Sequence, residues 1–203
     1  MANRGSRKKI PLTIKEISLV SRVICYIATG IAIIACILSA VYAIHKMGLL
    51  NTAVDSDYLV ANAKYDTMFM IGSHFDTENL YTMIEAHPKE YIKFTALVYA
   101  KYSIQYAVFA IILCAIIVFL DFDNLKNPFT KKSTNIVDII IGCTMVMFFV
   151  NIIINYNIKL VSPDFVDRIN HYVYPVIYVM ATFGLLIFNY CLNTGRNMLD
   201  GGK

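Results

Sequence analysis

The side chains best suited to bind a metal ion lie between residues 74 and 87. Two histidines and three acids fall within these fourteen residues, and four of them are the candidate ligands: His74, Asp76, Glu85 and His87. Imidazole and carboxylate groups are ligands that zinc uses, but structural zinc sites usually contain a close pair such as CxxC or HxxxH. This segment contains neither pair, and HExxH, GxSxG and the P-loop pattern are also absent from the chain. We therefore predict no catalytic residues, no metal and no cofactor.

Three asparagines in strongly apolar surroundings are candidates for polar contacts inside a membrane. Asn151 and Asn155 are spaced i, i+4, so they share one face of a helix, and Asn189 lies in a separate apolar stretch. Amides within membrane spans hydrogen-bond neighbouring helices, at about 0.6 to 2 kcal/mol each. In an oligomer they could instead line a polar path. We expect helix contacts, and the polar path is the alternative.

A short polar connection contains the third set of candidate residues: Asn127, Pro128, Phe129 and Thr130. An Asn-Pro pair favours a turn, and the threonine is suited to cap the helix that follows. Phe129 can pack back against the protein. We predict a short structural link, with a docking site for a protein partner as the alternative.

Long apolar segments must position these residues. Hydrophobic residues make up 58% of the chain and charged residues 16%, whereas soluble domains contain about 25% charged residues. A helix needs about 20 apolar residues to cross a bilayer. We therefore predict an all-α fold, an integral membrane four-helix bundle formed by a single domain of residues 1–203. The spans are expected at about residues 20–45, 94–120, 138–158 and 171–192, with a long loop at 46–93 that holds one or two short helices.

The distribution of lysine and arginine predicts the orientation. Eleven of the eighteen Lys and Arg residues lie before or at the start of the first span, between the second and third spans, or after the fourth. Cytoplasmic segments near spans are enriched in these residues, so we expect cytoplasmic N- and C-termini and loop 46–93 outside. Lys101 lies near the start of the second span, and its ammonium is expected to reach the interface.

Composition also limits the partners. The net charge is +4, and the cations form no stripe interleaved with aromatic residues, so we expect no nucleic acid partner. The five cysteines all fall within apolar stretches, which argues against a disulfide framework. We expect a multi-pass protein of the cell membrane, in contact with the lipid bilayer and with either a protein partner or a second copy of the chain in a homo-oligomer.

The connection at residues 127–130 resembles a known sequence pattern. Asn127-Pro128-Phe129-Thr130, followed by Asn135-Ile136, is similar to the loop of a family of uncharacterised bacterial four-span membrane proteins, catalogued as a domain of unknown function. Members have a first span, a long outer segment, a second span, this loop and two closing spans. The resemblance implies the same topology here. Members are often encoded beside small helix-turn-helix regulators, which implies a role in a regulatory circuit.

Three functional hypotheses follow. The first is a non-catalytic membrane protein that acts as a sensor, regulator or interaction component, because the sequence contains no catalytic constellation. The second is an oligomeric channel or membrane-permeabilising effector that uses the three asparagines. The third is an enzyme that acts on lipids at the outer face, with four candidate residues: Asp55, Asp57, His74 and His87. Lipid turnover abolished by alanine at these positions would favour the enzyme, and ion flux through liposomes would favour the channel.

Overall fold

The computed structural model describes residues 12–69, 77–161 and 176–201, and the regular elements within these segments are all helices. Four helices are long: α1 (Leu12–Leu49), α4 (Pro88–Phe119), α6 (Lys131–Val161) and α8 (Val176–Gly201). Three are short: α2 (Ser56–Phe69), α3 (Thr77–Ala86) and α5 (Phe122–Lys126). The predicted all-α fold is confirmed for the described part of the chain.

The four long helices have the length and composition needed to cross a membrane. α4 has 32 residues and is about 48 Å long at the usual rise per residue. The hydrocarbon core is about 30 Å thick, so α4 is longer than needed to cross it. In each long helix, at most 28% of the most apolar window is buried within the protein. Such apolar exposure is expected of a multi-pass protein surrounded by lipid.

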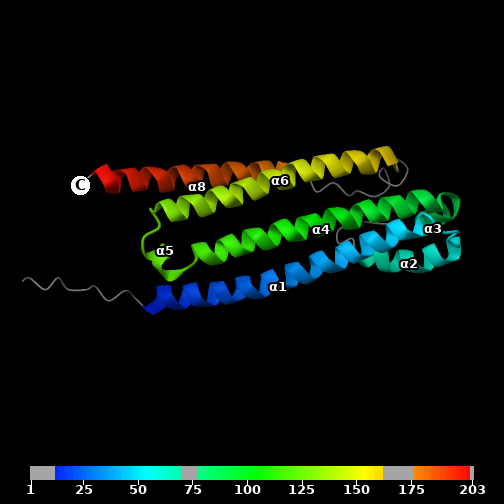
Figure 1. Ribbon diagram of the computed structural model, residues 1–203, viewed down its shortest axis with the longest axis horizontal. Helices are drawn as coiled ribbons and strands as arrows, with labels where there is room; N and C mark the ends of the chain where they lie inside the picture. Colours follow the sequence, from blue (N-terminus) through cyan, green and yellow to red (C-terminus); the bar gives the residue numbers. More distant parts are fainter. Residues whose placement is uncertain (1–11, 70–76, 162–175, 202–203) are drawn as a thin grey trace, which may run out of the picture.

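Successive long helices pack side by side, with α1 along α4, α4 along α6, and α6 along α8. Figure 1 shows α1 and α8 at opposite edges of the molecule. The four helices therefore form an open bundle in which α4 and α6 are the inner members. The start of α1, the short helix α5 and the end of α8 lie at one end of the molecule, and α2 and α3 lie at the other (Figure 1).

The short helices α2 and α3, which we call the cap, lie within the long loop predicted between the first two spans. Leu59 and Ala63 of α2 and Ile84 of α3 are fully buried. They pack in one hydrophobic cluster with Phe94 and Val98 of α4. The prediction of one or two short helices in this loop is confirmed, and the cap is a packed part of the bundle.

At the opposite end, polar contacts join α1 to the end of α4. Arg22 Nη1 donates a hydrogen bond to Asp121 Oδ1 at 2.9 Å. Ser18 Oγ donates to the carbonyl oxygen of Leu120 at 2.6 Å. Asp121 also accepts a hydrogen bond from the backbone N–H of Phe122 and caps α5. These contacts fix the register of α1 against α4 at this end.

Candidate functional site

A buried carboxylate joins the cap to the long helices. Asp66 of α2 is only 4% exposed. Its Oδ2 atom accepts hydrogen bonds from Lys46 Nζ at 2.7 Å and from the Tyr91 hydroxyl at 2.8 Å. Its Oδ1 atom accepts one from the Tyr99 hydroxyl at 2.9 Å. Lys46 lies in the last turn of α1, and both tyrosines belong to α4, so a single side chain of the cap contacts two long helices.

The charges in this cluster compensate each other. Lys46 is 4% exposed, and its ammonium lies 5.9 Å from the centroid of the Tyr91 ring, within the range of a cation–π contact. The Tyr99 ring in turn stacks on Tyr42 of α1, with centroids 5.4 Å apart. Both oxygens of Asp66 already accept hydrogen bonds from the protein. We call Lys46, Asp66, Tyr91 and Tyr99 the Asp66 cluster, and its geometry suits holding the cap better than attacking a substrate.

Lys101 lies inside the bundle, and the expectation that its ammonium reaches the interface was wrong. The residue is 3% exposed, and Nζ donates to Asn155 Oδ1 of α6 at 2.9 Å. Among the ion pairs of the described segments, none involves Lys101. The physical reason is that α4 is an inner helix, and position 101 falls on the side that packs against α6. Ionisable residues in such positions are commonly functional.

Asn151 connects three helices. It is fully buried, its Oδ1 accepts from Gln105 Nε2 of α4 at 3.0 Å, and its Nδ2 donates to the Met147 carbonyl at 2.8 Å. The Tyr178 side chain of α8 lies close enough to Asn151 for the two polar groups to interact. These contacts lie beside the Lys101–Asn155 pair along α4 and α6. We call the following set the polar seam: Lys101, Gln105, Asn151, Asn155 and Tyr178.

Asn189 lies away from the polar seam. Its Nδ2 donates to Asp138 Oδ1 of α6 at 2.6 Å. Between the polar seam and the Asn189–Asp138 contact, the hydroxyls of Thr144 and Thr182 lie 3.1 Å apart. The structure therefore places Asn151 and Asn155 of α6 side by side against α4, and places Asn189 separately at the α6–α8 contact. Each of the three asparagines contacts a neighbouring helix.

The connection at residues 127–130 makes the two contacts expected of Phe129 and Thr130. The Phe129 ring lies against Gly195 of α8, so closely that a Cβ added to the glycine would overlap the ring. Thr130 Oγ1 accepts from the backbone N–H of Ser133 at 3.2 Å and thereby caps α6. Phe129 is nevertheless 39% exposed. The structural link is confirmed in these contacts, and a docking role for the loop stays a prediction.

The described segments contain no group of three or more His, Cys, Asp or Glu residues that could hold a metal ion. His74 and Asp76 lie outside the described residues. His87 Nδ1 and Glu90 Oε1 approach to 3.7 Å, but both side chains are well exposed. This pair is an ordinary surface contact.

The Asp66 cluster was missed from the sequence, because Lys46 and Asp66 both fall in the predicted loop 46–93, for which no polar contacts were predicted. Two signals were available. Asp66 lies in a stretch of mainly apolar residues, and Tyr91 and Tyr99 are eight residues apart, which places them near one helix face. Neither signal identifies the partners, because the contacting residues are 20 to 33 positions apart in the chain.

No family model, curated protein or solved structure matches the chain. Function must therefore be inferred from the geometry of the cap, the Asp66 cluster and the polar seam.

Proposed function

We propose that this protein is a non-catalytic integral membrane protein that acts as a sensor or regulator, with the cap as its outer binding element. The Asp66 cluster carries this proposal. One carboxylate of α2 accepts hydrogen bonds from α1 and from α4. A ligand that moves α2 must either break these bonds or move the ends of both long helices, and a ligand shifts an equilibrium only through such differential contacts.

The α1–α4 pair offers a connection from the cap to the other end of the molecule. Arg22 of α1 bonds Asp121 directly after α4. Asp121 also caps α5, which begins the connection to α6. A shift of α1 along α4 at the cap therefore changes the contact that positions this connection. Helix shifts of about 1–2 Å are a common form of switching.

In this proposal the cap faces outward, and both termini and the α5–α6 connection face the cytoplasm of a bacterial cell. The enrichment of Lys and Arg near the termini and around α5 supports this orientation. The resemblance of the 127–130 loop to the bacterial four-span family supports the same topology and a regulatory role. The partner at the cytoplasmic side is then a second protein or a second copy of the chain.

Cysteine labelling at the cytoplasmic end tests the coupling. A single cysteine at Lys132, an exposed position, is introduced into a chain that lacks the five native cysteines. Asp66→Asn should change the rate at which a maleimide labels this cysteine in membrane vesicles. Asp57→Asn is the matched control, because Asp57 is exposed on the same short helix.

An unchanged labelling rate, together with hydrogen exchange that shows a loosened cap, would contradict the coupling. Purified protein that hydrolyses or transfers a lipid, and loses this activity on Asp55→Ala or Asp57→Ala, would instead establish the enzyme hypothesis.

A further inference from the structure

A small pocket opens between α4, α6 and α8, beside the polar seam. Its volume is about 200 Å³. Six residues line it: Gln105, Tyr106, Phe109, Ile112, Met147 and Tyr178. Gln105 lies near the middle of α4, about 21 Å along the helix from Phe119. Phe109 is half exposed, so the pocket is open on a side that faces lipid. Any molecule that enters at this level must therefore arrive from the bilayer.

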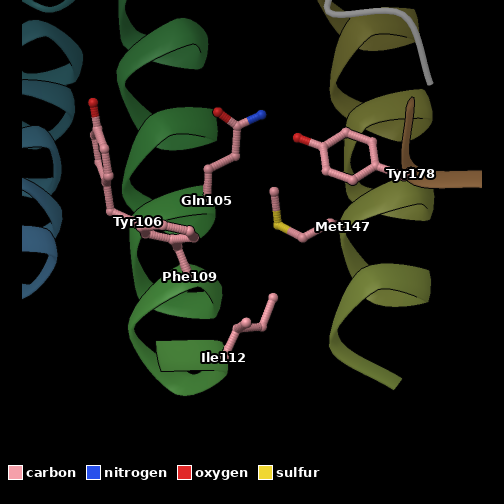
Figure 2. Close-up of a pocket in the computed structure, with 6 residues that line it drawn as sticks. All are labelled: Gln105, Tyr106, Phe109, Ile112, Met147 and Tyr178. Atoms are coloured by element: carbon pink, nitrogen blue, oxygen red, sulfur yellow. The ribbon is translucent and has the colours of Figure 1, made fainter. Parts of the chain in front are cut away.

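Two hydrogen-bond donors converge at the polar side of the pocket. Asn151 uses its Oδ1 for Gln105 and one N–H for the Met147 carbonyl, and Tyr178 lies within reach of the same side chain. Its second N–H suits the Tyr178 oxygen, which leaves the Tyr178 hydroxyl hydrogen and one N–H of Gln105 for a ligand. Figure 2 shows the ends of these two side chains pointing toward one another.

The other walls of the pocket are apolar. Phe109 and Ile112 line the part of the pocket below the two donors, and Met147 lies beside Tyr178 (Figure 2). An aromatic ring and a thioether favour contact with a flat ring. A volume of about 200 Å³ is smaller than the usual pocket for a drug-sized molecule, about 300–1,000 Å³. The pocket therefore suits one ring with small substituents, while a long tail stays in the lipid.

We propose that this pocket binds a membrane-dissolved molecule with a neutral, carbonyl-bearing ring and an apolar tail, of the isoprenoid quinone class. The ring carbonyl accepts hydrogen bonds from Tyr178 and Gln105, and the ring packs against Phe109 and Met147. A charged head group is disfavoured by its desolvation inside the membrane. A plain acyl chain would leave both donors without a partner. The proposal concerns binding alone.

The test measures equilibrium binding of a radiolabelled benzoquinone that carries one isoprene unit. The full-length chain in phospholipid nanodiscs should bind it saturably above empty nanodiscs. Tyr178→Phe keeps the ring but removes one hydrogen bond, so affinity should fall about three- to tenfold. Ile112→Phe fills the pocket and should abolish saturable binding while the polar pair stays intact. Tyr190→Phe, at a 72% exposed position of the same helix α8, should bind like the native chain.

A competition experiment separates a carbonyl site from a groove for acyl chains. An alkylbenzene with the same tail but no carbonyl should fail to displace the quinone. Equal displacement by this analogue, binding no greater than in empty nanodiscs, or equal affinity in the native, Tyr178→Phe and Ile112→Phe chains would each overturn the proposal.

Discussion

Asp66 is the residue through which the cap is attached to both α1 and α4. Asp66→Asn keeps the shape of the side chain but leaves the Lys46 ammonium buried without a counter-charge. Removing one partner of a buried ion pair costs about 3–5 kcal/mol. We expect the backbone amides of α2 to exchange with deuterium much faster in this variant. Hydrogen exchange followed by mass spectrometry in nanodiscs measures the change.

A second substitution separates the charge from the shape. Lys46→Met combined with Asp66→Asn removes the unpaired ammonium, while the amide oxygen at position 66 still accepts from Tyr91 or Tyr99. Exchange in α2 should therefore return part of the way toward the native rate. Faster exchange in the double variant than in Asp66→Asn would show that the ammonium, rather than its pairing with Asp66, holds the cap.

Lys101 also depends on a hydrogen-bond partner, Asn155, but removing the lysine should cost less than removing the asparagine. Asn155→Leu leaves a buried ammonium without its amide partner, and an unsatisfied buried group costs about 1–3 kcal/mol or more when charged. Lys101→Met should cost less than Asn155→Leu, because it leaves a neutral, partly exposed amide without its donor instead of a buried charge without its acceptor. Thermal unfolding of the purified protein in one detergent measures the change in Tm caused by each substitution. A Tm lowered as much by Lys101→Met as by Asn155→Leu would reveal a further partner of the ammonium.

At the scale of elements, the contact of Phe129 with Gly195 determines how the α5–α6 connection lies on α8. Gly195→Leu places a side chain where the ring now lies, so residues 127–130 should move outward and their amides should exchange faster. Adding Phe129→Ala should reverse much of this effect, since it removes the overlapping ring. Gly184→Leu is the control on the same helix, because nothing lies within 4 Å of a Cβ there. Equal exchange at 127–130 in both glycine variants would exclude the contact as the cause.

The packing of α4, α6 and α8 depends on Asn151. Asn151→Leu removes the acceptor for Gln105 and the partner of Tyr178, so we expect the free energy of unfolding to fall by about 1–3 kcal/mol. Asn157→Leu, at an exposed position of the same helix, should change it by less than about 0.5 kcal/mol. Reversible unfolding by denaturant in mixed micelles compares the two. A similar loss of unfolding free energy in both variants would mean that the hydrogen bonds of Asn151 contribute nothing to stability.

The Asn151→Leu variant also addresses the channel hypothesis. Asn151 and Asn155 hydrogen-bond α4 within a single chain, as helix packing predicts. Liposomes with the native chain should show no ion flux above empty liposomes. Native flux that disappears in Asn151→Leu, with assembly unchanged, would favour the polar path.

At the scale of the whole molecule, the orientation can be read from two exposed positions. Asp57 lies in the cap and Lys132 at the start of α6, and both are exposed, whereas Asp66 and Ser133 nearby are buried and unsuited to labelling. Single cysteines at positions 57 and 132 are treated with an impermeant maleimide on intact cells. We expect labelling at 57 only, because inversion would carry six cations before or at the start of the first span across the membrane. Labelling at 132 only would show the reverse orientation, and labelling at both would contradict four spans.

The sequence by itself determined that the described chain is helical and has four apolar segments long enough to span a membrane. It also predicted the short helices in the long loop and the local contacts of Phe129 and Thr130. These features depend on composition, apolar length and turn chemistry within a few residues. Orientation rests on the positions of Lys and Arg and stays a prediction.

Only the tertiary structure decided which polar side chains meet. Asp66 and Tyr99 are 33 positions apart in the chain, and Lys101 and Asn155 are 54 apart. Such pairs depend on the order in which helices pack and on the rotation of each helix about its axis. Burial in the described spans is low, and an apolar residue is equally suited to lipid and to a neighbouring helix. The apolar pattern therefore does not indicate which face of a span meets another helix, and so the sequence could not reveal the partners of Lys101 and Asp66.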